Sequence, residues 1–148
     1  MGRKFLVVRI EQHDARIVGM PEVRAALAAG GSPVVMDLDA AWVRFREAMP
    51  YARRVFDVDA LCECAGVSRD AGNKWLVVGA LPPPSIAASR GRGNARAWAY
   101  VDCFIGGVVG TLGRQRVPLP LLTEICAGLL RLRLPFPAEH KERETVPA

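Results

Sequence analysis

The sequence predicts a mainly α-helical fold with a small β component, in which a small α/β unit comes first. Apolar residues recur at helical spacing in several segments, whereas only short runs of β-branched residues, such as residues 5–10, are typical of strands. Hydrophobic residues make up 51% of the chain and charged residues 24%, a balance that can bury a core. The length of 148 residues suits one ordinary domain, or a compact domain with a smaller appendage.

Residues 1–52 predict a small α/β or helical unit. Residues 5–10 and 34–38 have the composition of strands, and Pro21 can open a helix that two glycines end. Apolar residues at helical spacing follow the second strand, and Pro50 ends that helix. About fifty residues rarely form an independent domain, so we expect this unit to pack on the rest of the chain or on a second copy.

Residues 53–134 begin with the pattern of two helices joined by a tight turn. Asp57 or Asp59 can cap a short helix over residues 59–64. Gly66 then allows the turn, and Ser68 can cap a second helix over residues 68–78, which the next glycine ends. The order predicts a helix-turn-helix.

The remaining residues predict a turn, a short strand and two more helices. Three prolines extend the chain, and residues 85–97 combine small and basic residues with glycines that permit a tight β turn. Trp98 and Tyr100 then alternate with alanines, as in a short strand with one aromatic face. A helix ended by Gly113 and a last amphipathic helix follow, and we expect the charged tail over residues 135–148 to be mobile.

Positive charge is concentrated in one segment. The formal net charge of the chain is +5. Residues 66–116 hold seven basic and two acidic residues, which also gives +5, so the rest of the chain is balanced. This placement favours an anionic partner that contacts the helix-turn-helix and the segment after it.

Two sets of residues in this region resemble the MerR-type helix-turn-helix signature, in which Trp or Tyr closes the recognition helix before a Gly-x-Leu-Pro exit. They are Leu61-x-x-x-Ala65-Gly66-Val67-Ser68-Arg69 and Trp75-x-x-x-Gly79-Ala80-Leu81-Pro82. Residues 96–102 and 117–122 are similar to the strand after the family's wing and to the start of its next helix. The resemblance covers about residues 56–131. It implies a MerR-like winged helix-turn-helix that binds duplex DNA, a fold that phage excisionases and terminase small subunits also use.

The resemblance also implies which residues contact DNA. The second helix would enter the major groove, and the basic loop after it, as a wing, would follow the backbone or enter the minor groove. Two arginines before the first helix would clamp a flanking phosphate. The implied set is Ser68, Arg69, Asn73 and Lys74 on the helix, Arg90, Arg92, Asn94 and Arg96 on the wing, and Arg53 and Arg54 before the first helix. Arg114 and Arg116 fit either a solvated surface or DNA contacts.

Three positions depart from the family pattern. Gly72 stands where an apolar helix former is usual, and glycine inside a helix costs about 1 kcal/mol relative to alanine, so we expect this helix to be weak or bent. Asn73 replaces a commonly basic residue, and Ala80 replaces a leucine. The long dimerising coiled coil and effector domain of the full-length regulators do not follow in this sequence, so we expect no small-molecule effector.

Other residues are interpreted as structural. Trp75, Trp98 and Tyr100 are expected in the core rather than stacked on bases. The four cysteines lack metal-binding spacing, so they are interpreted as reduced thiols, and neither a metal nor a cofactor is expected. On a helix, Cys62 and Cys64 point about 200° apart, so one should be packed and the other nearer the surface. No signal peptide or membrane-length apolar stretch is present in the sequence, which favours a cytoplasmic protein without a membrane partner.

These observations leave several functional hypotheses. The first is a sequence-specific DNA-binding protein, a transcriptional regulator that acts as a homodimer, because a single small reading head gives little affinity. A variant of it is a DNA-architectural, excisionase-like or phage packaging factor. Another class is a protein-interaction module built on a decayed helix-turn-helix. No enzyme is expected, since the sequence contains neither a nucleophile elbow nor a phosphate loop.

Overall fold

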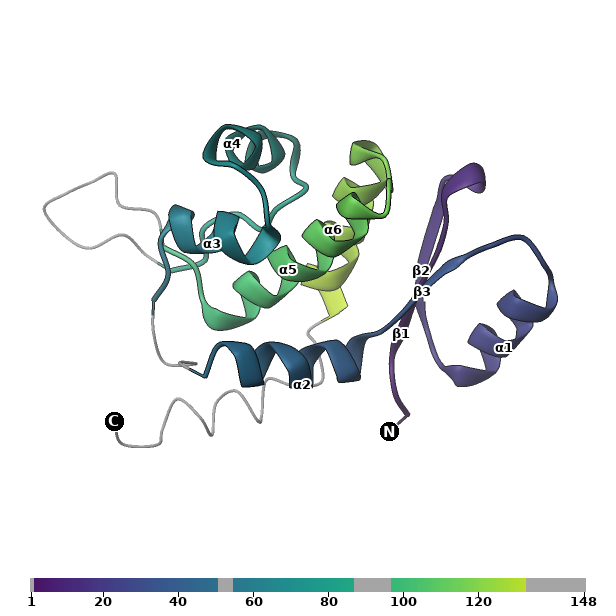
Figure 1. Ribbon diagram of the computed structural model, residues 1–148. Coiled ribbons are helices and arrows are strands. Elements are labelled where there is room, and N and C mark those ends of the chain that lie inside the picture. The colour runs from purple at the N-terminus through teal and green to yellow at the C-terminus, as the bar shows by residue number, and fades with distance from the viewer. Residues whose placement is uncertain (1, 51–54, 87–96, 133–148) are drawn as a thin grey trace, which may run out of the picture. The chain divides into compact units, whose positions relative to one another are not determined.

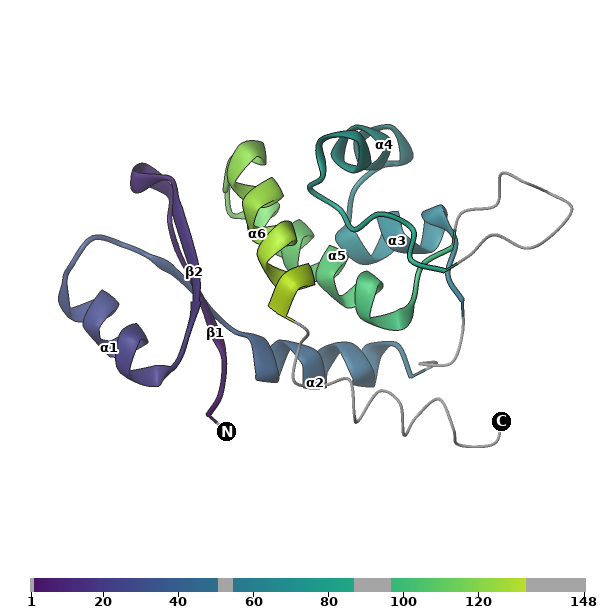
Figure 2. The same ribbon diagram turned by 180° about the vertical axis from the view of Figure 1, so that it is seen from behind.

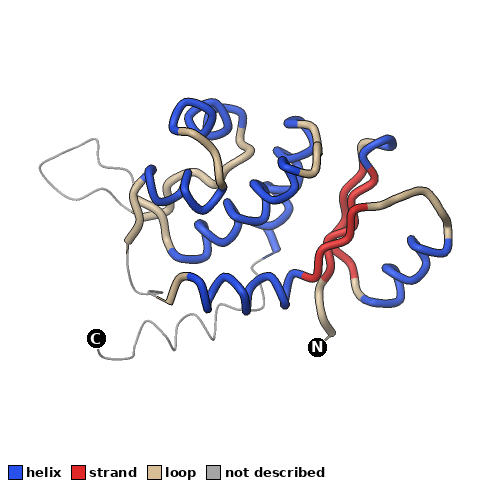
Figure 3. Tube along the Cα trace, viewed as in Figure 1, coloured by secondary structure: helices blue, strands red, loops and turns tan. Residues whose placement is uncertain are grey.

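The structure, a computed structural model, describes residues 2–50, 55–86 and 97–132. Over these residues the fold is mainly helical, with six α-helices and one three-stranded antiparallel sheet, which confirms the predicted mainly α class with a small β component. None of the helices in these ranges has both the length and the apolar character needed to cross a membrane. The chain divides into two compact units, Met1–Ala48 (unit 1) and Met49–Ala148 (unit 2), and Figure 3 shows all three strands in unit 1.

Unit 1 is a small sheet with two helices. Its elements are β1 (Phe5–Arg9), the 3-10 turn η1 (Ile10–Gln12), β2 (Asp14–Val18), α1 (Met20–Ala28), β3 (Val34–Asp37) and α2 (Leu38–Ala48). The strand order is β2-β1-β3, and the central β1 is antiparallel to both neighbours. Four successive apolar residues of β1 are buried, and two of them, Phe5 and Val7, pack with Val23 of α1. A strand buried on both faces is continuously apolar, which is why the sequence predicted β1.

The strand β2 was not predicted. The strands expected in this part of the chain covered only residues 5–10 and 34–38. In the structure His13 has a left-handed backbone (φ 51°) that closes the hairpin between β1 and β2. The strand lies at the edge of the sheet, where charged side chains such as the exposed Arg16 are common, so its residues show neither an apolar run nor clear alternation.

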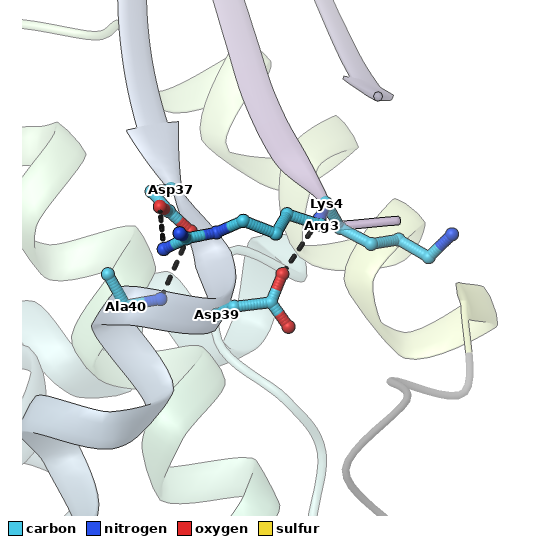
Figure 4. A network of polar contacts seen from close by, with 5 residues as sticks. All are labelled: Arg3, Lys4, Asp37, Asp39 and Ala40. Carbon is cyan, nitrogen blue, oxygen red and sulfur yellow. Dashed lines mark hydrogen bonds and ion pairs between the residues drawn. The ribbon is translucent and has the colours of Figure 1, made fainter. Parts of the chain in front are cut away.

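Two aspartates hold the junction between β3 and α2 (Figure 4). Asp37 Oδ1 accepts a hydrogen bond from the backbone N–H of Ala40 at 3.0 Å and so caps the first turn of α2. The same carboxylate pairs with Arg3, and Asp39 Oδ2 accepts from the backbone N–H of Lys4 at 2.8 Å. Arg3 is therefore held through its side chain and Lys4 through its backbone, and neither residue belongs to the buried core of the described residues.

Unit 2 consists of α3 (Val58–Ala65), α4 (Arg69–Val78), α5 (Tyr100–Arg114) and α6 (Leu119–Leu132). The mostly buried α5 packs against both α3 and α6, as two opposite views show (Figures 1 and 2). Glycines permit this approach: a Cβ at Gly106 would lie 3.0 Å from Leu61 Cδ1, and a Cβ at Gly110 would overlap the backbone of Ala65. These two glycines are therefore close-packing residues of the core of unit 2.

Two details around α5 correct the sequence analysis. Gly113 does not end this helix, which continues to Arg114. The expected strand over Trp98 and Tyr100 is reduced to isolated antiparallel bridges, Phe56 with Trp98 and Ile86 with Ala97, because Tyr100 already begins α5. Both aromatic side chains are nonetheless buried, which confirms their core role.

Candidate nucleic-acid interface

Helices α3 and α4 are separated by a turn of three residues, and each helix is capped at both ends. Asp57 Oδ1 accepts from a backbone N–H of the first turn of α3 at 2.9 Å, and Gly66 ends this helix with a left-handed φ of 71°. Ser68 Oγ accepts from a backbone N–H of the first turn of α4 at 3.1 Å, and Gly79 ends that helix at φ 84°. Since only glycine adopts this backbone readily, these local signals explain why the turn was predictable.

Gly72 is the point at which α4 meets α3. It is buried, and a Cβ at this position would overlap the Sγ of Cys62 on α3. The helix runs without interruption from Arg69 to Val78. The missing side chain of Gly72 allows the two helices to pack closely, and the helix continues through this residue; that Gly72 weakens or bends the helix stays a prediction.

Arg114 joins the end of α5 to the same turn. Its Nη1 donates to the carbonyl oxygen of Ala65 at 3.1 Å, and its Nη2 lies 3.3 Å from Thr111 Oγ1. The guanidinium occupies the space that a side chain at Gly66 would need. A cation at the last carbonyls of α3 also interacts favourably with the helix dipole. Arg114, for which the sequence allowed a solvated surface or a DNA contact, therefore supports the turn.

The face of α4 that points away from Gly72 is exposed and mostly polar. The exposed residues of this helix around that face are Arg69, Asp70, Asn73, Lys74, Val77 and Val78. Arg69 forms an ion pair with Asp59 of α3: its Nη1 lies 2.7 Å from Asp59 Oδ1, and both side chains are largely exposed. Asn73 and Lys74 stand one turn further along.

No family model, curated protein or solved structure matches this chain.

The structure thus brings together four of the ten sequence-predicted DNA-binding residues. Ser68 and Arg69 lie at the N-terminus of α4, and Asn73 and Lys74 lie on its exposed face. The other six, Arg53, Arg54, Arg90, Arg92, Asn94 and Arg96, lie outside the described residues.

The two ends of the basic segment over residues 87–96 are held next to each other. The backbone N–H of Ile86 donates to the carbonyl of Ala97 at 3.2 Å, and Phe56 and Trp98 exchange two backbone hydrogen bonds of 3.0 and 2.9 Å. The indole of Trp98 also donates to the carbonyl of Pro82 at 2.7 Å. The residues on either side of the segment are therefore anchored to the core of unit 2.

The cysteines of unit 2 form part of its packing. Cys62 is buried and Cys64 is half-buried, as their opposite directions on a helix predicted. A hydrogen bond from Cys103 lowers the pKa of the Cys64 thiol, although burial and Glu63 act in the opposite direction, and the same bond, with burial, raises the pKa of Cys103. Burial, followed by Asp102, raises the pKa of Cys126 to about 12.

Sequence reasoning missed two residues of this surface. Asp59 was considered only as a helix cap, yet its carboxylate pairs with Arg69 across the turn. Val77 was assigned no role, and its side chain is 86% exposed. The helical spacing from Gly72 would have placed Val77 on the outer face, had Gly72 been recognised as the inner contact.

Proposed function

We propose that this protein binds duplex DNA with sequence specificity, as a transcriptional regulator, through a MerR-like winged helix-turn-helix. The observation that carries the proposal is the packing of α4 on α3 through Gly72, which leaves the opposite, polar face of α4 exposed. The major groove is about 12 Å wide and admits one α-helix. In this proposal α4 is that helix.

The exposed groups on α4 have the chemistry that groove binding needs. Lys74 supplies a cation for a phosphate or a guanine edge, and the amide of Asn73 can make two hydrogen bonds to adenine. Arg69 stands beside the N-terminus of a ten-residue helix, whose backbone N–H groups and dipole attract phosphate. Its pair with Asp59 is exposed and therefore weak, so a phosphate can replace the carboxylate.

The segment over residues 85–97 is proposed as the wing. In sequence it carries Arg90, Arg92 and Arg96 together with Asn94. The bridge between Ile86 and Ala97 supports this assignment, because it joins the two ends of the segment as the base of a hairpin would. A wing at this place would contact the backbone or minor groove beside the site of α4.

The alternative of a protein-interaction module takes Gly72 as the residue that weakens the helix-turn-helix. The close approach of Gly72 to Cys62 gives this glycine a packing role as well. The architectural and packaging alternatives use the same surface. A protein of either kind would bind DNA without sequence preference and would bend it, whereas a regulator would select one sequence. We propose a homodimer, since two reading heads are needed for useful affinity.

The test of this function compares two double variants by fluorescence anisotropy with duplexes selected from genomic fragments. Arg69→Ala with Lys74→Ala removes two cations of α4, and we expect a loss of affinity of about 10- to 100-fold. Arg3→Ala with Lys4→Ala removes the same charge from unit 1, where neither side chain fills a core, and should change affinity by about twofold or less. Equal losses would exclude α4 as the DNA-contacting helix, and the absence of salt-sensitive binding to any duplex would exclude the function.

A further inference from the structure

Val77 is the most exposed large hydrophobic residue of the described chain, with 86% of its surface accessible. It lies on α4, five residues after the buried Gly72 and therefore about 140° around the helix from the contact with α3. Asn73 precedes it by four residues, so the two side chains are neighbours on the outer face. Val77 thus stands beside the amide that we propose to read DNA.

The fold does not need a valine at this position. The exposed side chain fills no part of the core, so its truncation removes almost no buried surface. Valine is also a poorer helix former than alanine or lysine, because its branched side chain loses rotamer freedom in a helix. Neither packing nor helix propensity therefore explains the residue.

The neighbours of Val77 favour DNA over a protein as the occupant of this face. Its nearest polar neighbours on the outer face are the exposed Lys74 and Asn73, a cation and an amide that suit phosphates and base edges, and Asp70 lies two turns before it. Val78, which follows it in the helix, is the other exposed valine of α4, at 46%. The exposed surface of these two valines is far below the roughly 800 Å² that each partner of a stable protein complex buries.

We infer that Val77 contacts the 5-methyl group of a thymine in the major groove, next to an adenine that Asn73 reads, so that the target contains adjacent A·T pairs. The thymine methyl is the apolar group that the major groove presents, and aliphatic side chains pack on it. This inference rests on the proposed function and adds to it the sequence class of the target and the residue that selects it.

The test uses the tightest duplex recovered from a random pool by the full-length protein. Each thymine is replaced singly by uracil, which removes the methyl group and keeps the base pair. We expect one position at which the replacement weakens wild-type binding about fourfold, the effect of burying one methyl-sized group. In Val77→Ala the same replacement should have a clearly smaller effect, because the two terminal methyl groups that contact the thymine methyl are gone.

Val43→Ala is the matched control, since Val43 is an exposed valine (51%) on α2 of unit 1. It should keep the full sensitivity to uracil. If wild-type protein binds the duplex but no thymine is sensitive, or if Val77→Ala stays as sensitive as wild type, the inference is overturned while the proposed function stands. Sequence-blind binding overturns it in the same way, and a protein that binds no duplex removes the proposed function itself.

Discussion

Gly72 and Cys62 set how closely α4 approaches α3. A glycine in the middle of a helix normally lowers stability by up to about 1 kcal/mol relative to alanine. Here a Cβ would overlap the Sγ of Cys62, and such overlaps in a packed interface cost about 1 to 3 kcal/mol. The steric term is the larger of the two, so glycine is the better residue at this position.

Gly72→Ala should therefore lower the free energy of unfolding by about 1 to 2 kcal/mol, despite the better helix propensity of alanine. In a Cys62→Ala background the same substitution should be neutral or stabilising, because the next atoms, the Cβ of residue 62 and Val67 Cγ2, lie at the ordinary contact distance of 3.6 Å. Urea denaturation of the four proteins of this cycle measures both effects. A stabilising Gly72→Ala in the wild-type background would contradict the close contact.

At the scale of elements, Ser68 combines two roles that can be separated. Its Oγ caps α4 at 3.1 Å, and the residue stands where the N-terminus of the helix would approach a phosphate. A cap stabilises a helix whatever the charge of its oxygen, whereas approach to phosphate depends on that charge. Changing the charge of the capping side chain should therefore affect DNA binding while the stability of the helix is kept.

Ser68→Asp should keep the cap, and with it the stability of unit 2, yet weaken DNA binding about tenfold through repulsion of phosphate. Ser68→Ala should lower the unfolding free energy by about 1 kcal/mol, because a backbone N–H of α4 loses its acceptor. Thermal unfolding and anisotropy, measured on both variants, separate the two roles. Unchanged DNA binding by a stable Ser68→Asp protein would show that this helix end does not approach DNA.

For the whole molecule, the decisive property is the placement of charge. The segment over residues 66–116 contains seven basic and two acidic residues, and the described cations among them include Arg69, Lys74 and Arg114. Arg114 is engaged with the carbonyl of Ala65, so it supports the turn rather than adding a free contact. The salt dependence of the binding constant shows how many phosphates the protein neutralises.

The logarithm of the binding constant should fall with the logarithm of salt concentration with a slope of about −4 to −5, as expected for five neutralised phosphates. Lys74→Ala should make the slope shallower by about 0.9, since one contact is lost. Lys4→Ala should leave it unchanged, because that side chain belongs to unit 1. Anisotropy titrations at several salt concentrations provide the slopes, and a slope near zero for the wild type would exclude binding through phosphates.

The sequence predicted those parts of the fold that depend on local signals. The turn between α3 and α4 was found because Gly66 and Ser68 act on neighbouring residues of the chain. The edge strand β2 was missed because it is defined by pairing with β1 rather than by its own pattern. The packing role of Gly72 was not predicted for a related reason: Cys62 is ten residues away, and only the packing of α4 on α3 brings them together.

The bridge between Ile86 and Ala97 also affects how this protein can diversify. Because both ends of the segment are anchored, residues can be inserted or deleted between them while the four helices of unit 2 keep their packing. The entropic cost of closing a loop depends weakly on its length, since doubling the length of a flexible loop costs only about 0.6 kcal/mol. Evolution can therefore alter the length and charge of this segment independently of α4, and relatives with different insertions here would share one scaffold.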